Sequence, residues 1–200
     1  TWLELDVVIG SVHDAFNLSR EEMTARLIRA CEHPYVTLIG HPTGRRVGGF
    51  AGYEFDYDAV FAAAARTGTA MEIDGQPARL DLPSTLARRA KASGVTLTCD
   101  SDAHAVADLA NVELAIGQAR RAGLEASDVL NARSLDEVLT FQFGIDALHR
   151  GCGRAVQTLH FAEAGKAISR LQFSRTNRNF QLFHQALIFS LSGNSLVAHA

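Results

Sequence analysis

The feature that most constrains the fold of this chain is a repeated alternation of short apolar, β-branched runs with longer amphipathic stretches. The apolar runs recur at roughly thirty-residue intervals, which suits one βα unit. Each run has the composition of a buried strand, and each is followed by a polar loop and a helical pattern. We therefore predict an α/β fold of parallel strands in sequence order, joined by right-handed helical crossovers. The predicted strands lie at Asp6–Gly10, Val36–Gly40, Thr69–Ile73 and Val95–Thr98.

Helix start and stop signals separate these strands. Ser19 and Glu22 form a capping box, and the apolar stripe after it (Met23, Leu27, Ile28 and Cys31) predicts a helix that ends before Pro34. Asp56 predicts the N-cap of a second helix that Gly68 ends. The remaining predicted helices are 84–92, closed by Gly94; 112–122, with Leu114, Ile116 and Ala119 inward; and a short helix from the capping box at Ser134 and Glu137 to about Phe141.

After Phe141 the alternation stops, which divides the chain into residues 1–141 and an unassigned tail, residues 142–200. We expect the tail to pack poorly on the rest, because it lacks the periodicity of the preceding units. Its apolar segment Leu182–Leu191 predicts one short helix. Since the chain begins with Thr1 and enters a strand almost at once, we interpret it as a fragment.

Composition excludes several classes of protein. The chain has 19 basic and 22 acidic residues, a net charge of −3, so nucleic acid would have to be held locally. Its three cysteines, Cys31, Cys99 and Cys152, form no CxxC pair and fit a reducing compartment such as the cytoplasm. Because no signal peptide and no membrane-spanning apolar run is present, we expect no membrane partner.

Polar side chains that bind metals follow each predicted strand. His13 follows the first strand, His41 the second, and Glu72 and Asp74 end the third, whereas Asp102 and His104 follow the fourth. Sites of parallel α/β folds form at the carboxyl ends of strands. Alone, Asp102 could cap a helix and His104 could be a solvated loop residue. Four consecutive strand ends of this kind favour a shared site for ions such as Mn²⁺ or Zn²⁺.

Two arginines, Arg45 and Arg79, lie in loops after strands and are candidates for binding a phosphate. Their alternative roles are ordinary surface residues or ion-pair partners of Glu54 or Asp81. The sequence contains no P-loop, no GxGxxG and no GxSxG nucleophile motif. Metal ions and arginines together indicate phosphoester hydrolysis, in which a metal cluster activates water and holds the phosphate oxygens.

The motifs of this chain resemble one known family. Residues 6–141 are similar to the C-terminal PHP (polymerase and histidinol phosphatase) domain of bacterial family X DNA polymerases. The similarity rests on Gly10-Ser-Val-His13, Gly40-His-Pro-Thr-Gly-Arg45, Gly52-Tyr-Glu-Phe55, Met71-Glu-Ile-Asp-Gly-Gln-Pro77, Arg79-Leu-Asp-Leu82 and Ser101-Asp-Ala-His104.

The resemblance implies a distorted (β/α)₇ barrel, of which this chain is the second half, and a Mn²⁺- or Zn²⁺-dependent phosphoesterase. The usual activity is 3′–5′ exonuclease action on DNA ends during repair. By motif, His13, His41, Asp102 and His104 match metal ligands, with Asp102 and His104 also carrying the catalysis. Arg45 matches a motif arginine that contacts phosphate or holds the loop.

The chain departs from the family pattern in four places. The earlier barrel ligands and the polymerase domains are absent, Asp74 stands where the family usually has Asn, the loop 46–51 lacks the expected leucines and arginine, and the tail has no recognised counterpart.

Three functions compete on this evidence. The first is the exonuclease module of a family X polymerase, incomplete here. The second is a separate PHP phosphatase of small monoesters such as histidinol phosphate. The third is a truncated product that catalyses nothing. The GHPTGR and RLDL elements favour the first over the second, and the missing ligands favour the third.

Overall fold

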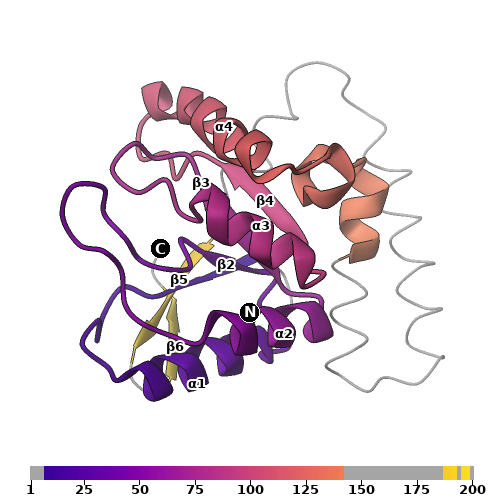
Figure 1. The fold of residues 1–200 in the computed structure, drawn as a ribbon. Helices are drawn as coiled ribbons and strands as arrows, with labels where there is room; N and C mark the ends of the chain where they lie inside the picture. The colour runs from indigo at the N-terminus through magenta and orange to yellow at the C-terminus, as the bar shows by residue number, and fades with distance from the viewer. Residues whose placement is uncertain (1–6, 142–186, 193–194, 199–200) are drawn as a thin grey trace, which may run out of the picture.

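In the computed structural model of the chain, residues 7–141, 187–192 and 195–198 are described. They form a sheet with the strand order β4-β3-β2-β1-β5-β6 (Figure 1). The first four strands pair in parallel and in sequence order, as predicted. These strands are β1 (Val8–Ser11), β2 (Leu38–Gly40), β3 (Ala70–Asp74) and β4 (Leu97–Asp100).

Four helices alternate with these strands and pack against one face of the sheet (Figure 1). The predicted caps are confirmed. Ser19 and Glu22 form the capping box that starts α1, and Asp56 caps α2 by accepting a hydrogen bond from the Ala59 amide. Gly68 ends α2 in a left-handed conformation. The helices are α1 (Arg20–Cys31), α2 (Tyr57–Thr67), α3 (Ser84–Ala92) and α4 (Val112–Ala122).

Alternation along the strands gives the sheet two apolar faces. On β2, Ile39 belongs to the large core beneath the helices, whereas its neighbour Leu38 belongs to a smaller cluster on the other face. On β3, Met71 and Ala70 divide in the same way. Apolar residues on both faces are typical of parallel strands that are covered on both sides. The smaller cluster is completed by Leu130 and the partly buried Val138 and Phe141.

The prediction that Leu114 and Ile116 face the core is wrong, because both side chains of α4 are exposed. The helix instead buries a row of small residues together with Gln118, whose side-chain oxygen accepts a hydrogen bond from the Ser84 amide. This bond and the close packing against α3, which itself buries Ala87 and Ala90, set the rotation of α4. The small residues on this buried face are Ala115, Ala119 and Ala122.

The prediction of a helix over Leu182–Leu191 is also wrong. Strand β5 (Leu187–Ser192) pairs in parallel with β1, and β6 (Ser195–Ala198) pairs antiparallel with β5. An apolar run without clear periodicity fits strand or helix equally well, and here the open edge of β1 decides. A signal for the hairpin was present, since Gly193-Asn194 separates two apolar runs. The prediction of poor packing covers the whole tail, residues 142–200. Residues 142–186, 193–194 and 199–200 lie outside the described residues, whereas β5 of the same tail pairs with β1 over four residues, against that prediction.

The outer edge of β4 is covered by a side chain. Asn131 accepts a hydrogen bond from the Cys99 amide at 3.1 Å and donates one to the Cys99 carbonyl at 2.6 Å. Val129 bridges to Leu97 beside it. Covering an edge in this way protects it from pairing with another chain. The described strands form an open sheet whose pairing does not close into a barrel.

Short 3₁₀ helices complete the described part of the chain: η2 (Val106–Asn111), η3 (Ala126–Asp128) and η4 (Leu130–Ala132). The capping box at Ser134 and Glu137 precedes a helical stretch over 135–141, as predicted. Within the described ranges, no helix combines the length and the apolar character needed to cross a bilayer.

A pair of leucine truncations tests this packing. Leu27→Ala in α1 removes a fully buried side chain and should lower the free energy of unfolding by about 2–5 kcal/mol. Leu114→Ala in α4 removes an exposed one and should change it by less than about 0.5 kcal/mol. Urea unfolding followed by circular dichroism measures both. Equal losses from the two variants would show that α4 is rotated differently from the structure described here.

Candidate functional site

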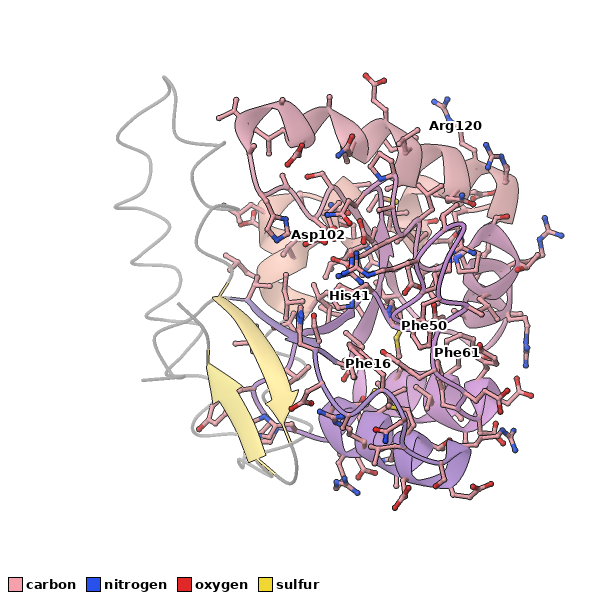
Figure 2. All side chains as sticks on the ribbon, turned by 90° about the vertical axis from the view of Figure 1, so that its left-hand side faces the viewer. Phe16, His41, Phe50, Phe61, Asp102 and Arg120 are labelled. Atoms are coloured by element: carbon pink, nitrogen blue, oxygen red, sulfur yellow. The ribbon has the colours of Figure 1, made fainter. Side chains whose placement is uncertain are left out.

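The loops that follow the four parallel strands gather at one edge of the sheet, on the left in Figure 1 and facing the viewer in Figure 2. Each loop contains one non-glycine residue with a positive φ angle: Ala15, His41, Leu80 and Asp102. Such a conformation costs on the order of 1–3 kcal/mol for an L residue, and it concentrates at functional sites. Two of the four, His41 and Asp102, are predicted ligands.

His13 and His41 lie together, although they come from different strands. Their ring centroids are 5.0 Å apart and the rings are nearly perpendicular. His13 is exposed, whereas His41 is 4% exposed and its Nδ1 has no hydrogen-bond partner among the described residues. Burial and the nearby positive charge of Arg79 lower the pKa of His41 to about 3. His41 is therefore a neutral imidazole near pH 7, which is the form that binds metal ions.

Glu72 of β3 holds His41 in its strained conformation, because its Oε2 accepts a hydrogen bond from the His41 amide. The position before His41 must be glycine. A Cβ on Gly40 would lie 2.4 Å from the Ser11 hydroxyl and 3.4 Å from the same Glu72 oxygen. The glycine in the GHPTGR motif thus lets strand β2 pass between its neighbours at this point.

Buried carboxyl groups end strands β3 and β4. Burial raises the pKa of Glu72 well above its usual value, and the hydrogen-bonded Asp100 carboxyl raises it further. Burial raises the pKa of Asp100 to about 6 and that of Asp74 to about 7. These groups are expensive to ionise together in a water-poor place. The strand ends therefore hold carboxyl groups whose negative charge a bound cation would stabilise.

Arg79 is the positive charge that lies among these carboxyl groups. Its Nε is 3.5 Å from Oδ2 of Asp102 and 3.8 Å from Oδ2 of Asp74, and its side chain is 13% exposed. Both distances are longer than a hydrogen bond, and the Nε makes none within the described residues. The predicted phosphate-binding residue Arg79 is thus in the site, but it faces carboxylates on one side.

Asp102 and His104 lie together, as their spacing of two predicts. Nδ1 of His104 is 2.8 Å from the Asp102 carbonyl oxygen and 4.0 Å from its Oδ1. Because a carbonyl only accepts hydrogen bonds, Nδ1 carries a proton, and in the neutral imidazole Nε2 then keeps its lone pair. With its side chain 69% exposed, His104 lies at the rim of the site.

The two motif loops are tied to each other by polar contacts. Oδ2 of the buried Asp81 accepts a hydrogen bond from the Thr43 amide at 3.0 Å. Nε of Arg45 donates to the carbonyl oxygen of Arg79 at 2.8 Å. The geometry therefore gives Arg45 a role in holding the loop that presents Arg79. Arg45 and Arg79 are both predicted to contact phosphate, and of these two the structure places only Arg79 among the site residues.

A cavity of about 320 Å³ opens beside the histidine pair. Gly44 belongs to its wall and needs to be glycine, since its φ is +63° and a Cβ would lie 2.5 Å from the Tyr53 ring. The other lining residues are Val12, His13, Phe16, Arg46, Phe50 and Arg79. Sequence reasoning missed Arg46, Phe16 and Phe50. A signal for Arg46 was its position directly after Arg45 in the same glycine-rich loop.

Metal binding by the four predicted ligands stays a prediction, and two features of the strand ends bear on it. The buried Nδ1 of His41, which has no hydrogen-bond partner among the described residues, and the buried Glu72 carboxyl group beside it are features that a cation would satisfy. In the part of the chain that the structure describes, no three His, Cys, Asp or Glu side chains are placed to share one ion. His13 with His41 and Asp102 with His104 form two pairs, with Arg79 near both.

The fold and this edge of the sheet define an α/β protein with its polar site at the carboxyl ends of parallel strands. No family model matches the chain. It is 41% identical over 138 residues to the DNA polymerase/3′-5′ exonuclease PolX of Bacillus subtilis, covering 69% of this chain and 24% of PolX.

A probable phosphatase of a Thermoanaerobacter species is 34% identical over 137 residues, which cover 64% of this chain and 54% of that protein. A probable phosphatase of Shewanella sediminis is 30% identical over 146 residues, 69% of this chain and 56% of that protein. The chain thus spans about a quarter of PolX and about half of these phosphatases. Together with the motifs, the similarities show that the chain fits a PHP-type domain of a family X DNA polymerase.

The raised pKa values predict an unusual dependence of stability on pH. Glu72, Asp74 and Asp100 have higher pKa values in the folded chain than in the unfolded one, so the folded state binds more protons between about pH 4 and pH 7. Their contribution to stability is fully present below their unfolded pKa values and is lost as pH rises through the folded values. His41 opposes this effect below pH 6.5, its ordinary pKa. Burial also raises the pKa of Asp81 and of Asp102, so these two carboxyl groups act in the same direction as Glu72, Asp74 and Asp100.

We therefore expect the urea midpoint to increase as the pH is lowered from about 8 to about 5. Asp74→Asn keeps an acceptor for the Gln76 amide and removes the group that titrates near pH 7. This variant should flatten the profile between about pH 6 and pH 8. A wild-type midpoint that rises with pH over this range would contradict the assignment of protons to these buried carboxyl groups.

Proposed function

We propose that this chain is the phosphoesterase module of a family X DNA polymerase, acting as a metal-dependent 3′–5′ exonuclease on DNA ends. One observation carries the proposal: the cavity at the strand ends is lined by two arginines and by His13, whose ring packs against that of His41. The similarity to PolX supports DNA as the substrate, because that relative carries the exonuclease name.

The arginines account for substrate binding. Arg46 and Arg79 both line the cavity, and guanidinium groups neutralise and orient a phosphodiester. The cross-loop bonds of Arg45 and Asp81 fix the loops that carry them, so the phosphate meets a preformed surface.

The ligand residues account for the chemistry. We propose that His13, His41, Asp102 and His104 bind Mn²⁺ or Zn²⁺, which, when bound, supplies a Lewis acid that stabilises charge on the phosphoryl oxygens. Nε2 of His104, at the solvent rim, is placed to take or give a proton. Asp102 orients this imidazole through its own backbone carbonyl.

A second function is favoured by the probable phosphatases among the relatives. In that case the same cavity would bind a small phosphate monoester such as histidinol phosphate. A mononucleotide-sized monoester fits a cavity of this volume, which lies at the lower end of the range for small-molecule sites.

Hydrolysis assays on the full chain separate these functions. A 5′-labelled single-stranded oligonucleotide should lose nucleotides from its 3′ end with Mn²⁺, and EDTA should stop the reaction. His41→Ala and Asp102→Asn should each lower the rate by about a hundredfold or more. His33→Ala, which changes a histidine outside the site, is the matched control and should keep the wild-type rate.

Arginine variants test the binding role. Arg79→Ala should raise KM and lower kcat, whereas Arg120→Ala on α4, which Figure 2 shows far from His41 and Asp102, should change neither. Turnover of small monoesters without oligonucleotide cleavage would favour the phosphatase function. If the wild-type chain cleaves neither substrate class with Mn²⁺ or Zn²⁺, the proposed catalysis is wrong for this chain.

A further inference from the structure

Two exposed aromatic rings flank the arginines of the cavity. Phe16 comes from the loop after β1 and Phe50 from the loop after β2, and they are 45% and 42% exposed. Their ring centroids are 6.0 Å apart, with the rings inclined at 56°. Both rings line the cavity together with Arg46 and Arg79. Figure 2 shows both residues on the side of the molecule that carries His41 and Asp102.

The surrounding structure holds these rings in place. Phe16 is stacked on the ring of Tyr53, with centroids 6.2 Å apart and an interplanar angle of 9°. Tyr53 itself is buried. The carbonyl of Phe50 accepts a hydrogen bond from the Arg46 amide at 2.7 Å, and the next amide, that of Val47, bonds to Ala78. The stacking on Tyr53 and the loop's backbone bonds therefore place both rings at the surface of the cavity.

The aromatic and guanidinium groups that line the cavity favour a ligand with both a flat ring and a phosphate. Flat apolar rings stack on the face of any nucleobase, and guanidinium groups bind phosphate. Arg46 is exposed, lines the cavity and makes no side-chain hydrogen bond or ion pair within the described residues, so its guanidinium group is available to an incoming anion. A nucleotide combines a base and a phosphate at the spacing of one sugar.

We infer that Phe16 and Phe50 form a base-binding wall that stacks on the nucleobase of a nucleotide whose phosphate is held by Arg46 and Arg79. This inference rests on the proposed function, and it adds that the site selects nucleotides over other phosphoesters through the base. The nucleotide is either the unpaired 3′-terminal residue of a DNA strand or a free mononucleotide, since both present the same chemistry.

Binding measured in EDTA separates recognition from hydrolysis. Fluorescence anisotropy of the full chain is compared for two 5′-labelled single-stranded oligonucleotides, one with a normal 3′-terminal residue and one with an abasic residue there. The intact strand should bind about fivefold to a hundredfold more tightly, which is the effect of stacking one base. Phe16→Ala and Phe50→Ala should reduce or abolish this ratio.

Two further variants and a second set of ligands sharpen the test. Phe16→Trp keeps a stacking surface and should retain the ratio. Val47→Ala, in the same loop as Phe50 but outside the cavity lining, should bind both strands as wild type does. Wild type and Phe16→Ala are also compared with a free deoxynucleoside 5′-monophosphate and with deoxyribose 5-phosphate by calorimetry. If tighter binding of the base-containing ligand is seen only in this calorimetric comparison and not with the oligonucleotides, the free nucleotide is the ligand.

The results distinguish this inference from the proposed function. Base selection that depends on Phe16 and Phe50 supports the inference even if Mn²⁺ releases no nucleotide, in which case the exonuclease proposal fails alone. Equal affinities for intact and abasic ligands in both arms, or an unchanged ratio in the Phe16→Ala and Phe50→Ala variants, would overturn the inference. Cleavage of DNA would still support the proposed function in that case.

Discussion

Parallel pairing of β1 to β4 in sequence order brings the carboxyl ends of all four strands to one edge of the sheet. Each strand then has to return across the same face through a helix, which is why α1 to α4 share one large apolar core. The loops that leave the strands meet at that edge, and the positive φ angles of His41 and Asp102 show that the backbone is strained there.

The site combines buried acidic side chains at the strand ends with one largely buried arginine. Glu72, Asp74 and Asp100 are acids whose pKa values burial raises, and Arg79 is the cation that faces them. Arg79 would be costly to bury here without the carboxyl groups that face it, because an unpaired buried charge is expensive. An added cation or a phosphate changes this balance directly, so the same groups that shape the fold can respond to a ligand.

The GHPTGR and RLDL motifs have a structural meaning that their sequence did not reveal. Asp81 binds the Thr43 amide and Arg45 binds the Arg79 carbonyl, so each motif fixes the loop that carries the other. A substrate-binding surface made of two loops needs such a brace, since loops otherwise move more than the strands they connect. Arg45 and Asp81 thus have a positioning role, because their bonds hold the two loops that carry Arg79 and Arg46.

The sequence alone determined what depends on local patterns. Capping residues such as Ser19 and Asp56, terminating glycines and the alternation of strand and helix predicted the elements and their parallel order. It also placed His13, His41, Asp102 and His104 at strand ends. The rotation of α4, which leaves Leu114 exposed, was not predictable, because small residues and the bond to Gln118 decide it.

The position of β5 was likewise decided by the tertiary structure, since an apolar run takes the conformation that an available strand edge offers it. The residues that line the cavity were also decided by the tertiary structure. Arg46, Phe16 and Phe50 come from two different loops, and no spacing along the chain relates them. The sequence determined which residues end the strands, and only the tertiary structure decided which loop residues face them, because loop conformation depends on contacts between segments far apart in the chain.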